Sequence, residues 1–483
     1  MHQSVTQRIL GLLLILFSIT LLPPILVSLW YNDTGLRAFL IAFFVMFGVG
    51  MMLWLPARHA RKELHLHDGF MITAVFWIVL SIVGALPFLF VPVPNLTLAQ
   101  AVFEAVSGFT TTGATVIIGL DTLPRSILYY RQQLQWLGGL GIIVLAVAVL
   151  PMLGIGGMQL YRAETPGPMR DEKLTPRLEN TAKALLYIYV TLTLACAIAY
   201  WLAGMSLFDA IGHSYSTVAT GGFSTHDTSL GHFNSPTIEI IAMVFIMLGS
   251  LNFTIHFVAW RKSDVSYYWS DIQGRVFVYI VLVLIAITVA VLMGQGVYSN
   301  FWTALRYGSF EVISIISSTG YAITEFSEWP LFLPVLILGS GFIGGCVGST
   351  AGGFRVIRLI LLYKQAIREI MRLIHPNAVI TVKIDNKKVS DTVAQAVWGF
   401  AFLYIASYVF LSILFMATGA DIVTAFSAIA ATLNMTGPGL GKVAGTYAEI
   451  SSMGLWILSF TMLLARLEIF TLLVLLSPAF WRR

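Results

Sequence analysis

The chain has 483 residues, of which 58% are hydrophobic and only 11% are charged. Its mean hydropathy is +0.84, whereas a soluble protein has about a quarter of its residues charged. The formal net charge of +5 is too small and too scattered to indicate nucleic-acid binding. Cys196 and Cys346 lie far apart in apolar runs, which excludes a disulfide framework and a cysteine metal cluster.

The apolar residues occur in uncharged runs of about 20, long enough to cross about 30 Å of hydrocarbon as helices. The sequence therefore predicts an all-α polytopic membrane protein. The first run is expected to be a retained span, because Arg8 is its only leading charge and Pro23 and Pro24 interrupt it. Ten full spans are expected, near 8–30, 38–56, 70–92, 133–157, 184–204, 237–260, 275–295, 331–366, 393–418 and 450–479.

The distribution of basic residues predicts the orientation of these spans. With the N-terminus in the cytoplasm, 20 of the 28 Lys and Arg residues fall in inward segments, 5 in outward segments and 3 within spans. Cytoplasmic loops carry the excess of Lys and Arg in helical membrane proteins. We therefore expect both termini in the cytoplasm.

Acidic residues gather on the opposite side and predict an outer mouth that attracts cations. The alternative, that they are ordinary loop acids, stays open at this point. The set comprises Glu104, Asp121, Asp209, Asp227, Glu311, Glu325, Glu328, Asp421 and Glu449.

Four outward stretches are too apolar for loops and too short for spans. Each contains Thr, Ser or Asn shortly before a glycine, and these glycines are Gly113, Gly222, Gly320 and Gly437. Their separations of 109, 98 and 117 residues give a regular period, which indicates four internal copies of a span, a half-crossing and a span. Thr-Gly pairs can also merely end helices, but four at a regular period favour duplication.

Four such copies around one axis predict a pore. Irregular backbone is tolerated at membrane depth where it lines a cavity, and its carbonyl oxygens can replace the water around a cation. Glycine permits the positive φ that such a segment needs. The expected organisation is two extra N-terminal helices at 1–69, followed by pore repeats at 70–157, 158–260, 261–372 and 373–483.

The eighth span carries seven glycines between Gly339 and Gly353, which disfavours a continuous helix. We expect an intramembrane loop at 339–353 that acts as a gate below the pore loops. Arg466 in the last span needs a cavity or a partner, and its donors could hold loop carbonyls. Two alternatives stay open: helix packing through Gly341 and Gly345, and pairing of Arg466 with Glu468.

These segments resemble the TrkH family, the membrane subunits of Trk-type bacterial potassium uptake systems, which is grouped with the Ktr and HKT ion transporters. The resemblance covers essentially the whole chain. It rests on Ser107-Gly-Phe-Thr-Thr-Thr-Gly-Ala-Thr115, Gln135-Trp-Leu-Gly-Gly-Leu-Gly141, Gly221-Gly-Phe-Ser-Thr-His226, Gly344-Gly-Cys-Val-Gly-Ser-Thr350 and Asn434-Met-Thr-Gly-Pro-Gly439.

The resemblance implies a single-chain version of the potassium-channel pore, in which backbone carbonyls bind K⁺. Four filter glycines favour potassium over sodium, and the fourth loop departs most from the pattern because of Met435 and Pro438. The implied filter residues are Thr111, Thr112, Gly113, Thr220, Gly221, Gly222, Ser318, Thr319, Gly320, Met435, Thr436 and Gly437. The expected gate residues are Gly344, Gly345, Gly348, Gly352, Gly353 and Arg466.

The sequence thus predicts the pore-forming subunit of a potassium uptake system, with a K⁺/H⁺ or K⁺/Na⁺ symporter as the alternative. No arrangement of nucleophile and base indicates an enzyme, and no cofactor is expected in this chain. The resemblance implies a homodimer in the bacterial inner membrane and a separate nucleotide-binding regulatory ring. Basic cytoplasmic loops at 158–183, 261–275 and 367–392 are expected to dock that ring, with binding of anionic lipid as the alternative.

Overall fold

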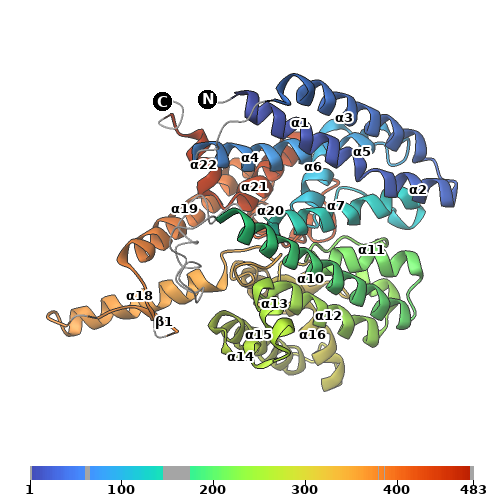
Figure 1. Ribbon diagram of the computed structural model, residues 1–483. Helices are drawn as coiled ribbons and strands as arrows, with labels where there is room; N and C mark the ends of the chain where they lie inside the picture. The colour runs from blue at the N-terminus through green and yellow to red at the C-terminus, as the bar shows by residue number, and fades with distance from the viewer. Residues whose placement is uncertain (1–2, 60–65, 145–173, 379, 386, 479–483) are drawn as a thin grey trace.

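The structure is a computed structural model that describes residues 3–59, 66–144, 174–378, 380–385 and 387–478. The regular structure of these residues is helical apart from one short hairpin, β1 (Lys383–Ile384) with β2 (Lys387–Lys388) (Figure 1). Within these ranges, six helices are long and apolar enough to span a membrane, or up to eight if each sharply bent pair counts as one span. The predicted class, a polytopic helical membrane protein, is confirmed.

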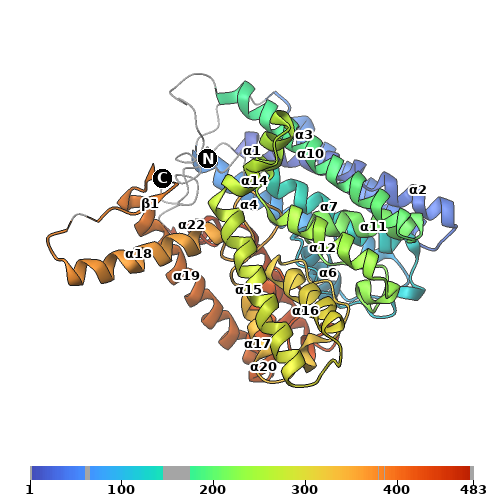
Figure 2. The ribbon, with the colours of Figure 1, turned by 90° about the horizontal axis from the view of Figure 1, so that it is seen from below.

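The N-terminal helices pack on one another and on the first repeat. Helix α1 contacts α3 and α4, and the last helix, α22, contacts α4 as well. The beginning of the chain and α22 therefore lie on the same side of the molecule, as Figures 1 and 2 show. The helices of this part are α1 (Gln3–Ile19), α2 (Leu22–Tyr31), α3 (Leu36–Ala57), α4 (Leu66–Val83), α5 (Leu86–Phe90) and α22 (Phe470–Leu476).

The rest of the chain repeats one pattern four times: a helix, a short apolar helix, a non-helical segment with one 3₁₀ turn, and another helix. The short helices are α6 (Leu98–Phe109), α11 (Leu207–Val218), α16 (Phe301–Ile316) and α20 (Ile422–Leu433). Their first partners are α4, α10 (Leu174–Leu202), α15 (Ile272–Gly294) and α19 (Asp391–Met416). The helices that follow are α7 (Arg125–Val144), α12 (Pro236–Ser250), α17 (Leu333–Ser340) and α21 (Ser452–Arg466).

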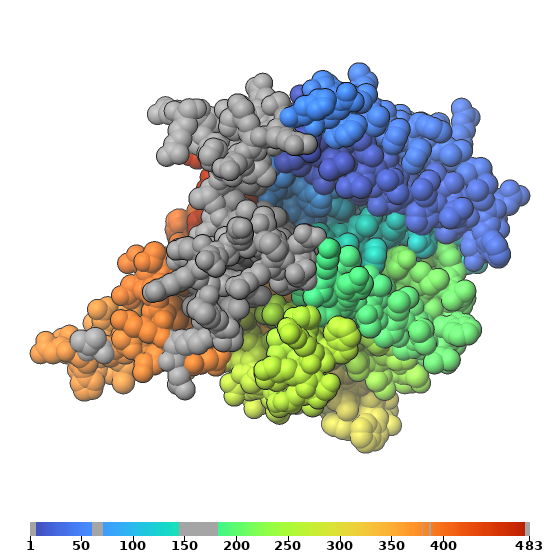
Figure 3. All heavy atoms as spheres, viewed as in Figure 1, coloured from blue at the N-terminus to red at the C-terminus, as the bar shows by residue number. Residues whose placement is uncertain are grey.

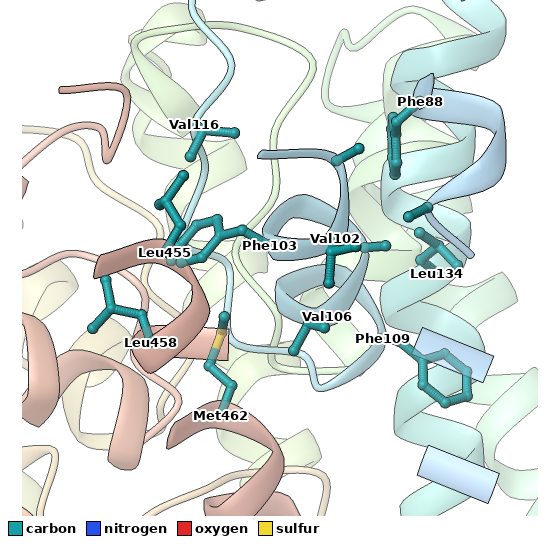
Figure 4. Close-up of a cluster of buried hydrophobic side chains, with 14 of the residues drawn as sticks. Phe88, Val102, Phe103, Val106, Phe109, Val116, Leu134, Leu455, Leu458 and Met462 are labelled. Atoms are coloured by element: carbon teal, nitrogen blue, oxygen red, sulfur yellow. The ribbon is translucent and has the colours of Figure 1, made fainter. Parts of the chain in front are cut away.

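Helix contacts close the four repeats into a ring. Each short helix packs on the last helix of the preceding repeat: α11 on α7, α16 on α12, α20 on α17, and α6 on α21. Figure 4 shows the closing contact, in which Phe103 of α6 lies beside Leu455 of α21, and Val106 lies on the side of α6 that faces Met462. The chain therefore surrounds a central axis to which all four short helices contribute.

Local sequence explains where the short helices begin. Thr97, Ser206, Asn300 and Asp421 precede them, and each side chain accepts a hydrogen bond from a backbone N–H of the first turn. Such caps satisfy amides that would otherwise lack partners at a helix start. The same chemistry therefore fixes the start of all four short helices.

Two spans expected to be continuous are sharply bent. Helix α12 meets α13 (Phe253–Lys262) at 98°, and α21 meets α22 at 112°. At the first bend the glycine-rich segment supplies the missing backbone partners, because Cys346 N donates to Ser250 O and Phe253 N donates to Gly348 O. At the second bend, Glu468 and Ile469 both have φ of 54°. The predicted fourth span at 133–157 extends beyond α7 into residues outside the described ranges.

The eighth span is also interrupted, as its glycines predicted. Helix α17 ends at Ser340 and α18 (Val356–Ile374) begins 16 residues later. From there α18 extends away from the body of the molecule, together with the hairpin (Figures 2 and 3). A short helix, α14 (Ser266–Ser270), connects the end of α13 to α15.

Replacing Leu458 by Ala is expected to destabilise the protein, because this side chain is fully buried between α6 and α21. Leu→Ala in a packed core costs about 2 to 5 kcal/mol. The thermal unfolding temperature in detergent should fall clearly below that of Met453→Ala, a control on the same helix whose side chain is 65% exposed. Equal unfolding temperatures would show that the α6–α21 contact is not a packed interface.

Candidate ion filter and gate

The four segments that follow the short helices have the same backbone conformation. Two residues before each predicted filter glycine lies a non-glycine residue with positive φ: Thr111 at 58°, Thr220 at 50°, Ser318 at 57° and Met435 at 59°. The filter glycines themselves have φ between 79° and 83°. The fourth loop keeps this geometry despite Met435 and Pro438.

Hydrogen bonds reinforce the shared conformation. In each loop the amide between these two positions donates to the carbonyl oxygen five residues earlier, within the short helix. These bonds are Thr112 N to Ser107 O, Gly221 N to Ser216 O, Thr319 N to Ser314 O and Thr436 N to Ala431 O, at 2.8 to 2.9 Å. Each loop is therefore attached to its helix in the same way.

Contacts between neighbouring loops close a second ring inside the ring of helices. A Cβ at Gly113 would lie 2.1 Å from the carbonyl oxygen of Gly221 in the next loop. The same contact recurs at 2.0 Å from Gly222 to Thr319 O, at 2.0 Å from Gly320 to Thr436 O, and at 2.8 Å from Gly437 to Thr112 O. Only glycine leaves room for the neighbouring carbonyl, so four carbonyl oxygens and four glycines alternate around one axis.

This ring is built from neutral backbone. Carbonyl oxygens are ligands for hard monovalent cations, and a filter of carbonyls can replace an ion's hydration shell. Side chains hold one carbonyl of the ring and one next to it: Gln135 Nε2 donates to Gly221 O at 2.6 Å, and Tyr447 Oη donates to Gly437 O, the residue after Thr436, at 2.8 Å. The arrangement can therefore bind a dehydrated cation through carbonyl groups that side-chain hydrogen bonds hold in place.

A buried ion pair joins the first two loops. Arg131 Nε donates to Glu104 Oε1 at 2.8 Å, Arg131 Nη1 donates to Ser224 O, and Glu104 accepts the amide of Val116. Glu104 is therefore an internal brace, and its expected place in an acidic outer mouth is wrong. Glu311 is buried too, where it accepts the amides of Ile323 and Thr324.

The other expected acids of the outer mouth lie at or near the surface. Asp121, Asp227, Glu325, Glu328, Asp421 and Glu449 are exposed, and Asp209 is partly buried. Asp121 and Asp209 flank His226. Burial of the His226 imidazole lowers its pKa, but the nearby carboxylates of Asp209 and Asp121 outweigh this effect, so that the pKa lies above its ordinary value.

The glycine-rich segment lies directly against the filter loops. The Thr350 hydroxyl contacts the Thr220 hydroxyl of the second loop at 3.1 Å, and Gly352 N donates to Ser318 Oγ of the third loop at 2.5 Å. In the fourth loop, Met435 lies so close that a Cβ at Gly352 would be 2.9 Å from its methyl carbon. Three of the four positive-φ residues therefore touch one segment.

Arg466 contacts the fourth of these residues. Its Nη2 donates to Thr111 Oγ1 at 2.8 Å, and its Nη1 reaches the carbonyl oxygen of Thr350 at 3.4 Å. The side chain is fully buried, and its Nε has no hydrogen-bond partner among the described residues. Glu468 pairs instead with Arg358 of α18 at 2.5 Å, so the alternative pairing of Arg466 with Glu468 does not occur in the structure.

The expected gate glycines lie where side chains would collide with backbone or with Asn252. Gly344 and Gly353 have φ of 69° and 79°, and a Cβ on Gly344 would lie 2.1 Å from Gly352 O. A Cβ on Gly345 would be 2.6 Å from Ala351 Cβ and 3.0 Å from Ser250 O, and one on Gly348 would be 2.8 Å from Asn252 Oδ1. The segment is not helical, so the alternative of helix packing through Gly341 and Gly345 does not apply.

Sequence reasoning missed three residues of this arrangement. Gln135, which also accepts from Ser216 and from the amide of Phe223, is a polar residue at the start of the predicted span 133–157. Arg131 appeared as an ordinary outward charge, and Thr350 as part of a glycine-rich motif. A buried polar residue requires a partner, so Gln135 and Arg131 carried a signal that could have been found.

Replacing Gly320 by Ala is expected to destabilise the protein by about 2 kcal/mol or more. The cost should exceed that of an alanine with positive φ, because the Cβ would also collide with Thr436 O. Gly296→Ala is the matched control, because Gly296 has φ of 66° and a Cβ added there would have no atom within 4 Å. Thermal unfolding in detergent measures the difference. Similar losses in both variants would mean that the loops do not meet at this glycine.

Comparisons with known proteins give one result. Residues 35–483 match the family model for TrkH, described as a cation transport protein. The chain is 53% identical to the Trk system potassium uptake protein TrkH of Halomonas elongata over 99% of this chain and 98% of the relative. It is 51% identical to the protein of the same name from Escherichia coli over the full length of both.

The fold has an equally extensive match among solved structures. The crystal structure of the potassium transporter TrkH from Vibrio parahaemolyticus has a TM-score of 0.94 to this structure. Its sequence is 49% identical, and the match covers 100% of both chains. The shared family, the full-length coverage and the fourfold ring agree: the chain belongs to the TrkH family of cation transport proteins.

Proposed function

We propose that this chain is the pore-forming subunit of a potassium uptake system and moves K⁺ through a filter of backbone carbonyls. Relatives that match its full length are named potassium uptake proteins. The observation that carries the proposal is the alternation of four glycines with four carbonyl oxygens around one axis. K⁺ is the substrate, held by the twelve filter residues named above, and the transport needs no cofactor in this chain.

The glycine-rich segment and Arg466 form the gate of this pore. Together they touch Thr111, Thr220, Ser318 and Met435, one residue from each loop. The glycine-rich segment must move before an ion can leave the filter. Because Arg466 links Thr350 to the first loop, it holds the segment in the closed position.

The proposal extends to the membrane, the orientation and the partners of the chain. The excess of Lys and Arg on one side and the shared packing of α1 and α22 on α4 support an inner-membrane protein with both termini in the cytoplasm. We further propose a homodimer and a cytoplasmic nucleotide-binding regulatory ring. The ring would dock on the basic segments 261–275 and 367–392, near the projecting α18; most of 158–183 lies outside the described ranges.

Ion-coupled symport is the second candidate, and one buried acid favours it. Among the described residues, Glu104 and Glu239 are buried carboxylates paired with arginines. Glu311 is buried without a cationic partner among those residues, and its Oε2 accepts no hydrogen bond from them. If transport is coupled to protons, Glu311 is the group that can carry one, rather than Glu468, which pairs with Arg358.

Rubidium uptake into liposomes that contain the purified chain separates the two candidates. A channel predicts uptake that follows the rubidium gradient, does not require a pH or sodium gradient, and keeps this behaviour in Glu311→Gln. Symport predicts uptake that needs the coupling gradient and loses this requirement in Glu311→Gln, but not in Glu325→Gln, whose side chain is exposed. Uptake that strictly requires a gradient would reject the channel.

Replacing Arg466 by Ala is expected to raise rubidium flux in the absence of any regulatory subunit. The change removes two hydrogen bonds from a charged donor, each worth about 1.5 to 3 kcal/mol, so we expect an increase of about tenfold or more. Arg372→Ala is the control, because Arg372 is an exposed residue of α18. Flux in Arg466→Ala that equals wild-type flux, with the protein folded, would remove Arg466 from the gate.

A further inference from the structure

The outer loops of the first two repeats carry a second cluster of ligand groups, apart from the filter. Asp121, His226 and His232 each offer one ligand atom, and these atoms all lie within 4.8 Å of one another. Asp121 belongs to the 3₁₀ turn Leu120–Thr122 after the first filter loop. His232 belongs to the equivalent turn after the second loop, Ser229–Phe233, and His226 lies just before that turn.

We propose that these three side chains form a binding site for a divalent transition-metal ion of the Zn²⁺ class. Two imidazoles and one carboxylate are ligands that zinc prefers, whereas Mg²⁺ and Ca²⁺ take oxygen ligands. A site with three protein ligands leaves a fourth position for water. The proposal does not depend on the function proposed above.

The geometry of His226 suits a metal ligand whose second ring nitrogen faces a carboxylate. Its Nδ1 faces Asp121 Oδ1 at 2.5 Å, while its Nε2 makes no hydrogen bond to the described residues and lies 3.6 Å from Asp209 Oδ1. A histidine that binds zinc through one nitrogen commonly directs the other N–H to a carboxylate. Asp209 is itself fixed by the hydroxyl groups of Thr225 and Ser206.

Small movements of exposed groups complete the site. Ligand atoms around tetrahedral zinc lie about 3.3 Å apart, given bond lengths near 2.0 to 2.1 Å. The Asp121 carboxylate must therefore move slightly away from His226, and its side chain is 47% exposed and has room to do so. The rings of His226 and His232 are parallel, with centroids 3.5 Å apart. Because an imidazole binds a metal through a lone pair in its ring plane, the exposed His232 ring must turn out of this stack to share one ion with His226.

The two loops are held together before any metal binds. Asp227 Oδ1 accepts the amides of Gly119 and Leu120 at 3.0 and 3.1 Å, across 108 and 107 residues of sequence. This contact fixes the turn that carries Asp121 relative to His226. A bound metal would add a second cross-link between the first and second repeats on the outer side of the filter.

Calorimetric titration of the full-length, chelator-treated protein with ZnCl₂ tests the proposal, with MgCl₂ as the second probe. We expect one Zn²⁺ equivalent that Mg²⁺ does not compete for. His232→Ala should lose this equivalent or weaken it by more than about tenfold, since losing a ligand must cost at least as much as losing an outer contact. His375→Ala, which removes an exposed histidine at the end of α18, should leave it unchanged.

Thermal unfolding provides the second measurement, because an ion that binds only the folded protein raises its stability. Zn²⁺ should raise the unfolding temperature of the wild type and of His375→Ala, and not that of His232→Ala. Unchanged zinc affinity in His232→Ala, equal binding of Mg²⁺, or no zinc binding by the wild type would each overturn the proposal. The histidines would then form only a hydrogen-bonded stack.

Discussion

The close approach of four glycines to four carbonyl oxygens is the constraint on which the rest of the structure depends. Each glycine leaves no room for a β-carbon, because the neighbouring loop already places a carbonyl oxygen 2.0 to 2.8 Å from that position. The short helices must therefore end at the same depth and with the same hydrogen bonds. The capped N-termini and the packing of α6 on α21 keep the ring closed from outside.

Irregular backbone in a membrane protein needs partners for its polar groups, and here the segments supply them to one another. The glycine-rich segment between α17 and α18 donates to Ser318, accepts from Phe253 at the break between α12 and α13, and contacts Thr220. The broken helices and the glycine-rich segment are thus one hydrogen-bonded unit. Arg466 completes it by joining this unit to Thr111.

Most of this architecture could be predicted from the sequence, because it repeats. Hydropathy indicated the spans, and the period of Gly113, Gly222, Gly320 and Gly437 indicated four equivalent half-crossings. The 98° and 112° bends were missed, since they depend on partners far away in sequence, such as Gly348 for Phe253 and Arg358 for Glu468. Glu104 was wrongly predicted to lie in the outer mouth for the same reason, because the packing of α6 on α7 brings it to its partner Arg131.

The central claim, that the four loops coordinate cations on one axis, is tested most directly by locating bound ions. Anomalous diffraction from crystals of this protein grown in Rb⁺ or Tl⁺ would show them. We predict anomalous density on the axis, surrounded by the carbonyl oxygens of residues 112, 221, 319 and 436. Density confined to other parts of the protein, with the ring of carbonyls intact and no ion within it, would contradict the account.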